Sequence, residues 1–343
     1  MQKLWIINET FMKAQNPIVF WLVDPFSKTP ELQRSAAMAI HLYTQHGACQ
    51  VYPIYFFSAY LTGEYPLSLP PGLISEIKQT GQDKLDAIIK DIPIFEIKPL
   101  HIVARPYISM RESIEYLSRL TRRIKGVELL VTSTHSRSGF KRLFMGSFAE
   151  TLMLHAHELP ILFINPHWRR MSDFKKIVFP TDFSDQSKAA FLSFLPIARR
   201  LKSTLTLIHK LAFSWPPALM VSLDVGPFYE KVIQDELESK KSEAKRWVDY
   251  ALKEGVNVNY FIDRHEEDSV VESILHYTKN KKALIALAAQ SSPITTTLLG
   301  STTRSLIRHS ADPIWVIPSQ LTSAMAKSHM NTATSSQKQS SAA

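Results

Sequence analysis

One pattern of residues occurs in both halves of the sequence, and this repeat constrains the fold more than any other feature. Leu143–Ile164 reads LFMGSFAETLMLHAHELPILFI, and Leu298–Ile317 reads LLGSTTRSLIRHSADPIWVI. Each stretch has apolar residues, a Gly-Ser pair, a run with helical spacing, and a Pro that opens a short apolar strand. A histidine follows the glycine at the same distance in both, as His155 and His309. The sequence therefore predicts that one structural unit occurs twice.

Short apolar strands alternate with helical patterns along both halves. Such strands, separated by helices, form parallel sheets that are covered on both faces. The sequence therefore predicts an α/β fold with two repeated, doubly wound, five-stranded parallel-sheet domains. The predicted strands are 17–23, 49–57, 98–106, 127–134 and 160–164 in the first half, and 175–181, 203–211, 256–263, 282–289 and 313–317 in the second.

These patterns divide the chain into five segments. Residues 1–16 are an N-terminal extension, 17–166 a first domain, 167–175 a linker, and 176–318 a second domain. Residues 319–343 offer little apolar area to bury, so we expect a disordered tail. The chain has 343 residues, of which 45% are hydrophobic, and is long enough to fill two cores.

Composition narrows the class and the location of the protein. The single cysteine, Cys49, excludes an intrachain disulfide and a cysteine-based metal cluster. Its apolar surroundings favour a buried structural thiol over a reactive one. The N-terminal residues lack the apolar core of a signal peptide, and no run reaches the roughly 18 apolar residues of a membrane span. We therefore expect a cytoplasmic protein that does not enter a membrane.

The net charge of +9 raises the question of an anionic partner. Lys and Arg are scattered through the chain, and their densest cluster, RRIK at 122–125, fits the solvated end of a helix. Nucleic acid is therefore not an expected partner.

Several motifs resemble the universal stress protein family. In the second half these are KKIVFPTDFSDQSKAAF, TLTLIHK and LLGSTTRSLIRHSADPIWVIP. The first half matches more loosely, through WLVDPFS, STHSRSGFKRLFMGS and LPILFI. The resemblance covers roughly residues 17–166 and 174–318, so the chain resembles a tandem member with a degenerate first domain. It implies the adenine-nucleotide α-hydrolase-like fold in both halves.

The resemblance also implies where a nucleotide would bind. Nucleotide-binding members have an Asp at the end of the first strand, a Gly-x-x-Gly turn after the fourth, and Gly-Ser or Gly-Thr at the start of the last helix. Amides at a helix N-terminus suit phosphate oxygens, and glycine lets the backbone approach a ligand. By this resemblance the candidate nucleotide-binding residues are Asp24, Ser133, Ser136, Gly146, Ser147, Asp182, Gly300 and Ser301.

The glycines of the Gly-x-x-Gly turn are absent from this chain. Counting back from the Gly-Ser pairs places Ser133 and Ser136 at these positions in the first half. In the second half the count gives Leu287 and Gln290, or their neighbours if the loop carries a small gap. Pro293 also removes an amide donor from the second loop. If the turn needs a positive φ, each Ser costs about 1 kcal/mol relative to Gly. We therefore expect a degraded nucleotide site.

A further departure lies beside the expected position of the base. Lys210 stands where relatives usually have an apolar residue, and its counterpart in the first half is Phe56. The first loop also has Arg137, Lys141 and Arg142 nearby to attract phosphate. If either domain binds adenine nucleotide, we expect it to be the first.

Each motif also has a structural interpretation. The Gly-Ser pairs can simply begin helices, the two Asp residues can cap turns, and His155 and His309 can interact with helix C-termini. The run HEED at 265–268 suggests a metal site or acid–base chemistry, but we favour a solvated turn that caps the next helix. No phosphate loop with its Lys, HExxH or Gly-x-Ser-x-Gly motif occurs. This weakens the enzyme hypothesis, and no catalytic or metal-binding residue is assigned.

The function that these observations predict is a cytoplasmic stress-response binding or regulatory protein of the universal stress type. The alternatives are an ATP-binding switch with slow hydrolysis, and a purely structural module or carrier of an apolar ligand. The strands PILFI and PIWVI are expected to pair within the chain, because in the family these edge strands pair between domains. A homodimer, and bound ATP or another adenine nucleotide, stay open as partners.

Overall fold

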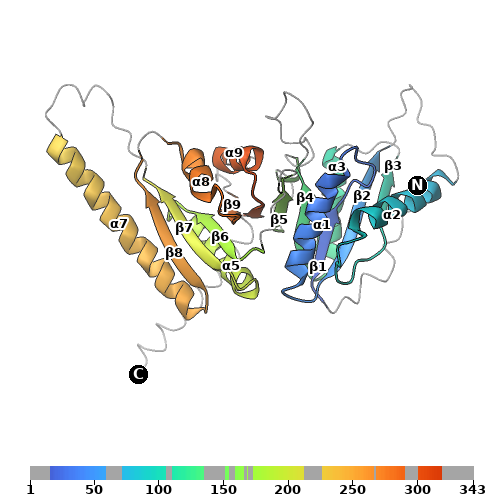
Figure 1. Cartoon of the computed structure of the whole chain (residues 1–343), viewed down its shortest axis with the longest axis horizontal. Helices are drawn as coiled ribbons and strands as arrows, with labels where there is room; N and C mark the ends of the chain where they lie inside the picture. The colour runs from blue at the N-terminus through green and yellow to red at the C-terminus, as the bar shows by residue number, and fades with distance from the viewer. Residues whose placement is uncertain are drawn as a thin grey trace. The chain divides into compact units, whose positions relative to one another are not determined.

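The structure is a computed structural model of the chain (Figure 1). Ser136, Gly146, Ser147, most of the N-terminal extension and the tail from residue 319 lie outside the described residues, and so do the predictions made for them. The structure describes residues 16–58, 72–105, 110–134, 151–153, 159–165, 168, 173–211, 226–265, 268–289 and 300–318.

The predicted order of strands and helices is confirmed. In the first half the elements are β1 (Ile18–Leu22), α1 (Pro30–Thr44), β2 (Gln50–Ser58), α2 (Leu73–Ile89), β3 (His101–Arg105), α3 (Met110–Arg123), β4 (Val127–Ser133) and β5 (Ile161–Ile164). In the second half they are β6 (Lys176–Pro180), α5 (Asp185–Arg200), β7 (Thr204–Lys210), α7 (Gly226–Lys253), β8 (Asn257–Asp263), α8 (Val270–Thr278), β9 (Leu284–Ala288), α9 (Ser301–His309) and β10 (Ile314–Ile317).

The described residues fall into two compact units. Unit 1 combines residues 16–168 with residues 289–318, and it therefore includes α9 and β10 from the end of the second half. Unit 2 consists of residues 173–288. The boundary between the compact units therefore does not coincide with the boundary between the two halves of the sequence. Helix α9 and strand β10 belong to the second half in sequence but to unit 1 in the structure.

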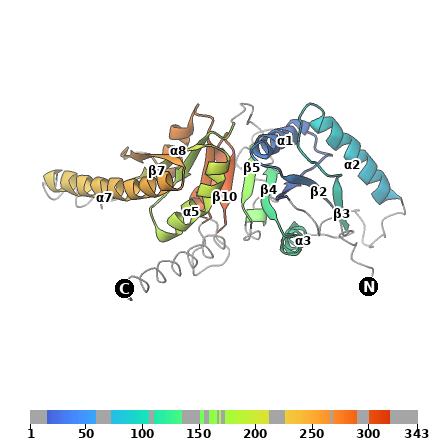
Figure 2. The same cartoon turned by 90° about the horizontal axis from the view of Figure 1, so that it is seen from below.

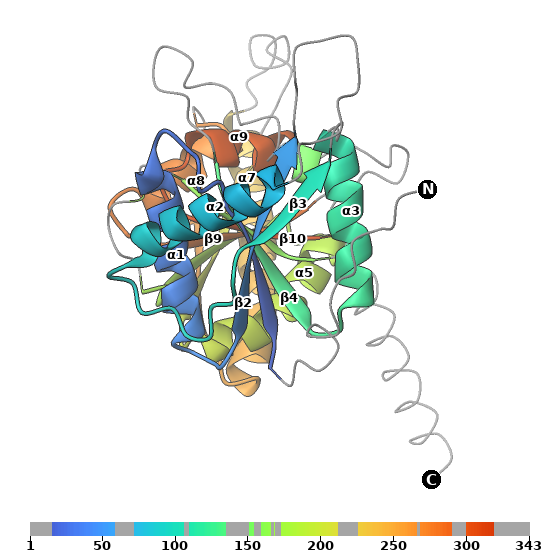
Figure 3. The same ribbon diagram turned by 90° about the vertical axis from the view of Figure 1, so that its right-hand side faces the viewer.

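The sheet of unit 1 has the order β3-β2-β1-β4-β5-β10. The first five strands are parallel. Strand β1, with the sequence IVFWL, lies between β2 and β4, and all five of its residues are buried. Helices α1 and α2 cover one face of this sheet and α3 covers the other (Figure 2, Figure 3). Coverage of both faces explains why β1 is apolar at every position.

Strand β10 continues the sheet of unit 1 in the opposite direction. It pairs antiparallel with β5, and Trp315 lies opposite Leu162. All four residues of each strand are buried. The predicted pairing of the two repeated apolar strands is confirmed, and it removes a free edge from β5.

The sheet of unit 2 has the order β9-β6-β7-β8, and its strands are parallel. The arrangement β2-β1-β4 of unit 1 recurs here as β7-β6-β9, which confirms the predicted α/β repeat. The long helix α7 packs along β8 (Figure 1). The carboxyl ends of parallel strands are where such folds bind ligands, so the search for a site begins there.

Candidate functional site

Asp182 lies in unit 2, two residues after the end of β6, and organises the turn into α5. Its Oδ1 accepts hydrogen bonds from the amide of Ser184 at 3.0 Å, the Ser184 hydroxyl at 2.6 Å and the Ser187 hydroxyl at 2.5 Å. Burial raises the pKa of Asp182, but these hydrogen bonds outweigh it and lower the pKa below its usual range. Ser184 is also the N-cap of α5 and accepts from the Ser187 amide. The carboxylate at this end of β6 is therefore ionised and fixed in place.

Asp24 holds the corresponding position in unit 1, after β1. Its Oδ1 accepts a hydrogen bond from the amide of Phe26 at 3.1 Å, which closes a short turn. The Phe26 ring lies 5.4 Å from the ring of Tyr55 on β2. Burial, and then the negative charge of Asp24, raise the pKa of Tyr55 to about 12. Aromatic side chains thus line the carboxyl end of β2 beside Asp24.

Ser133 is the last residue of β4, next to the end of β1 in the same sheet. Its side chain is buried, and its hydroxyl donates to the carbonyl of Leu32 in α1 at 2.9 Å. Its backbone is not among the residues with positive φ, so the premise of a strained, left-handed Ser is wrong for this position. The structure thus brings Asp24 and Ser133 to the same edge of unit 1, with the Ser133 side chain engaged in packing.

Gly300 and Ser301 begin α9 within unit 1. Gly300 has a φ of −53°, which any residue can adopt, and its carbonyl accepts from the Arg304 amide at 3.1 Å. Among the described residues, no side chain forms an N-cap hydrogen bond with this helix. The first-turn amides after Gly300 therefore keep the partial positive charge of a helix N-terminus.

Lys210 and Asp263 form a buried ion pair at the carboxyl ends of β7 and β8. The two residues are register partners, and the Lys210 ammonium lies 3.8 Å from Asp263 Oδ2. Their side chains are only 6% and 4% exposed. Among the described residues, no acceptor lies within hydrogen-bond distance of the Lys210 ammonium. The cation noted in the sequence is therefore balanced by a carboxylate on the neighbouring strand.

Asp263 also anchors the start of the HEED run. Its Oδ1 accepts from the backbone amide of His265 at 3.1 Å and from the ring Nδ1 at 2.7 Å. The next helix, α8, is capped by Ser269 and Glu272, which form a capping box. No group of three or more metal-binding side chains gathers in the part of the chain that the structure describes. His265 is thus held by a buried carboxylate, and the cap of α8 lies beyond the HEED run.

The free energy of unfolding of unit 2 is expected to fall in acid, because Asp263 becomes protonated. Burial raises the pKa of Asp263, but bonds from Ser273 and His265, together with Lys210, outweigh it and lower the pKa from 3.8 to about 2. A carboxyl whose pKa is lowered in the folded state adds stability above its unfolded pKa, and this is lost as pH falls through the folded value. Urea unfolding between pH 5 and pH 2, followed by tryptophan fluorescence, should show this loss between about pH 4 and pH 2. Asp263→Asn should flatten that part of the profile, and an unchanged slope would contradict the assignment.

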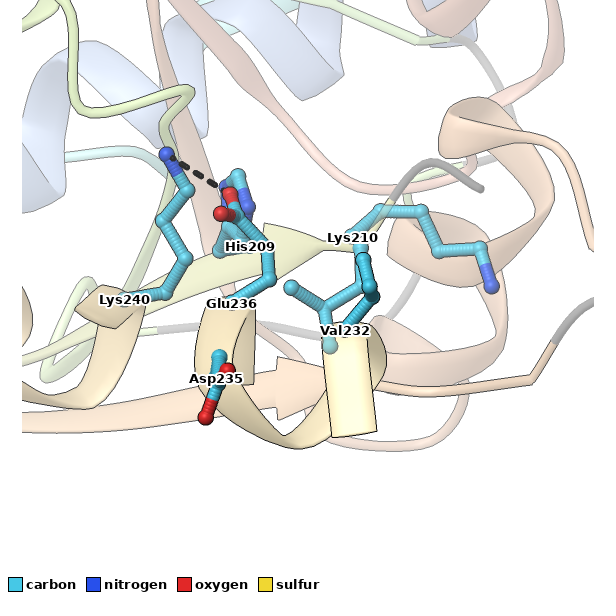
Figure 4. A pocket seen from close by; sticks show the side chains of 7 residues that line it. His209, Lys210, Val232, Asp235, Glu236 and Lys240 are labelled. Atoms are coloured by element: carbon cyan, nitrogen blue, oxygen red, sulfur yellow. Dashed lines mark ion pairs between the residues drawn. The ribbon is translucent and has the colours of Figure 1, made fainter. Parts of the chain in front are cut away.

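A cavity of about 650 Å³ lies in unit 2 between the end of β7 and α7 (Figure 4). Its volume lies within the range of small-molecule sites. None of the candidate nucleotide-binding residues that the structure describes lines it. The lining residues are His209, Lys210, Leu211, Val232, Asp235, Glu236 and Lys240.

Sequence reasoning missed Asp263, His209 and the two serines that bind Asp182. The serines could have been found, because Ser184 and Ser187 have the spacing of a helix N-cap and its third residue. Asp263 and His209 carry no comparable signal, because their partners depend on the register between strands and on the packing of α7.

One family model matches part of the chain. Residues 173–318 match the universal stress protein family. This match covers the second half of the chain and leaves the first half outside it. No curated protein matches the chain.

Solved structures extend the likeness to the first half. A universal stress protein from Archaeoglobus fulgidus is 17% identical with a TM-score of 0.56, and the match covers 88% of this chain and 98% of that one. A protein of unknown function from Pseudomonas aeruginosa is 10% identical with a TM-score of 0.55, covering 92% and 96%. At these identities the likeness shows a shared fold, which spans both halves. In the described part of the chain, no helix combines the length and the apolar character needed to cross a bilayer.

Proposed function

We propose that this protein is a cytoplasmic stress-response binding or regulatory protein whose nucleotide site is degraded. The observation that carries the proposal is the buried hydroxyl of Ser133, which donates to the Leu32 carbonyl. Nucleotide-binding members of the family have glycine at this position. Here the position is occupied by Ser133, whose side chain links β4 to α1 through this hydrogen bond. A loop that starts from such a residue has less freedom to close around phosphate oxygens.

The second half departs from the nucleotide-binding pattern in a different way. Lys210 replaces the apolar residue expected beside the base, and the ammonium is held near Asp263 on the adjacent strand. A base placed there would meet a buried ion pair instead of an apolar surface, and desolvating that pair further is costly. This supports the first domain as the one that keeps weak affinity for adenine nucleotide, since Asp24 and Ser133 lie at neighbouring strand ends.

Restoring the two glycines should strengthen ATP binding. In Ser133→Gly/Ser136→Gly, calorimetry should show an affinity about tenfold higher than in the wild type, because glycine at these positions gives the backbone more freedom to approach the phosphates. The gain comes with a stability cost of about 1 kcal/mol, because the hydrogen bond to Leu32 is lost. Thermal unfolding of the same samples separates the two effects.

Two further variants decide between the domains. Gly146→Val should abolish binding in the double variant, because a branched side chain would block the predicted phosphate side of the first domain. Tight binding by the wild type that Asp182→Asn removes would place the site in the second domain and overturn the proposal. Phosphate release from bound ATP would favour the hydrolytic switch instead.

A further inference from the structure

The cavity beside α7 has a buried histidine with one unused nitrogen. His209 is 9% exposed, and its Nδ1 lies 2.8 Å from the carbonyl oxygen of Thr181. A carbonyl only accepts, so Nδ1 donates, and in the neutral ring the other nitrogen, Nε2, is an acceptor. Burial lowers the pKa of His209, which favours this neutral form. Among the described residues no hydrogen bond reaches Nε2.

The ring of His209 is held in position by aromatic packing. The ring centre of Phe183 lies 5.1 Å from that of His209. The same Phe183 ring packs edge-on against Trp247 of α7, with 5.2 Å between the ring centres. The backbone of Phe183 has a φ of 60°, which is rare for a bulky residue. The acceptor is therefore fixed in direction before any ligand arrives, which is a property of binding sites.

Three charged residues that line the cavity, Asp235, Glu236 and Lys240, come from α7, and the fourth, Lys210, comes from β7. The Lys240 ammonium lies 3.3 Å from Glu236 Oε1, and Figure 4 shows both groups beside the His209 ring, whereas the carboxylate of Asp235 points away from it. The Lys240 side chain is 26% exposed and that of Glu236 is 45% exposed. The more exposed partner returns to water at the lower cost, so a ligand displaces Glu236 more readily than Lys240.

We propose that this cavity is a binding site for a small organic anion that carries a hydrogen-bond donor and an apolar body. The hydrogen-bond donor of the ligand binds His209 Nε2. Its anionic group replaces the Glu236 carboxylate as the ion-pair partner of Lys240. The apolar body lies against Val232 and Leu211. The lining shares Lys210 with the expected base position of the nucleotide site, but among the described residues it contains neither Asp182 nor Gly300, so the proposed contacts at His209 and Lys240 lie outside that site. A chain with a net charge of +9 also attracts anions at a distance.

The probe for this site is the anilinonaphthalenesulfonate isomer that carries its amine and its sulfonate at opposite ends of the naphthalene ring. It has one N–H donor, one anion and an apolar body, and its fluorescence rises in apolar surroundings. Titration of the full-length protein should give saturable binding at one site. The ether analogue, in which oxygen replaces the amine, should bind about fivefold more weakly, because it cannot donate to Nε2.

Charge variants on α7 test the position of the anion. Lys240→Gln should weaken binding of the probe by roughly tenfold, because a charge-assisted contact is lost. Glu236→Gln should strengthen it severalfold, because the competing carboxylate is removed. The matched control is the pair of Lys241 and Glu238 on the same helix, which are 2.8 Å apart and do not line the cavity.

Lys241→Gln and Glu238→Gln should leave the affinity for the probe unchanged. All four substitutions are on partly or fully exposed side chains, so they should leave the melting temperature close to that of the wild type. Absence of saturable binding, equal affinities for the amine and ether probes, or equal effects of the Lys240 and Lys241 variants would each overturn the proposal.

Discussion

Asp263→Asn is expected to lower the free energy of unfolding by about 3 kcal/mol at neutral pH. Asparagine has nearly the shape of aspartate but no charge, so the Lys210 ammonium would stay buried without a counter-ion. The two side chains are 6% and 4% exposed, so water cannot replace the lost carboxylate without opening the end of the sheet. Urea unfolding followed by tryptophan fluorescence measures the change, since Trp247 lies in the core of the same unit.

Lys210→Met provides the matched comparison. It removes the buried cation together with its desolvation cost and keeps the length of the side chain, so Lys210→Met/Asp263→Asn should recover most of the stability lost in Asp263→Asn. The double-mutant cycle gives the coupling between the two groups. A loss below about 1 kcal/mol in Asp263→Asn, or no recovery in the double variant, would show that the pair is solvated.

Trp315→Ala is expected to destabilise unit 1 by about 3–5 kcal/mol. Trp315 is 1% exposed, lies opposite Leu162 in the antiparallel pair, and has its ring 5.6 Å from that of Tyr43 in α1. Truncation would leave a cavity between β10, β5 and α1, and would also remove an aromatic contact. Chemical unfolding of the purified variant measures the effect.

Phe95→Ala is the control for Trp315→Ala. Phe95 is also a large aromatic residue of unit 1, but it is 52% exposed, so its truncation should cost less than about 1 kcal/mol. Similar losses in the two variants would mean that β10 contributes no more to unit 1 than a surface side chain does. That result would contradict the assignment of α9 and β10 to unit 1.

The sequence allowed the order of strands and helices to be predicted, because buried strands and amphipathic helices differ in apolar spacing. The pairing of β5 with β10 was expected through the resemblance to a family whose edge strands pair between domains. The sequence did not reveal that α9 and β10 belong to the same compact unit as the first half. That grouping depends on contacts such as the one between Trp315 and Tyr43, which join residues far apart in the chain.

The candidate site was predicted only in outline. The positions of Asp24, Asp182 and Ser133 at strand ends followed from the family resemblance, but the partners of their side chains did not. The Ser133 hydroxyl points to Leu32 because α1 packs on β4, and Lys210 meets Asp263 because β7 and β8 pair in that register. A shift of one residue in either strand would turn those side chains to the opposite face.

The pairing of β5 with β10 has a consequence for the synthesis of the chain. The residues of β10 leave the ribosome long after those of β5, by on the order of ten seconds at usual elongation rates. During that interval the apolar strand Ile161–Ile164 has no covering strand, although the rest of its sheet has been made. A nascent chain in this state exposes an edge on which other chains can add. Protein yield in cells is therefore expected to depend on how fast residues 165–317 are translated, and on chaperones that bind extended apolar segments.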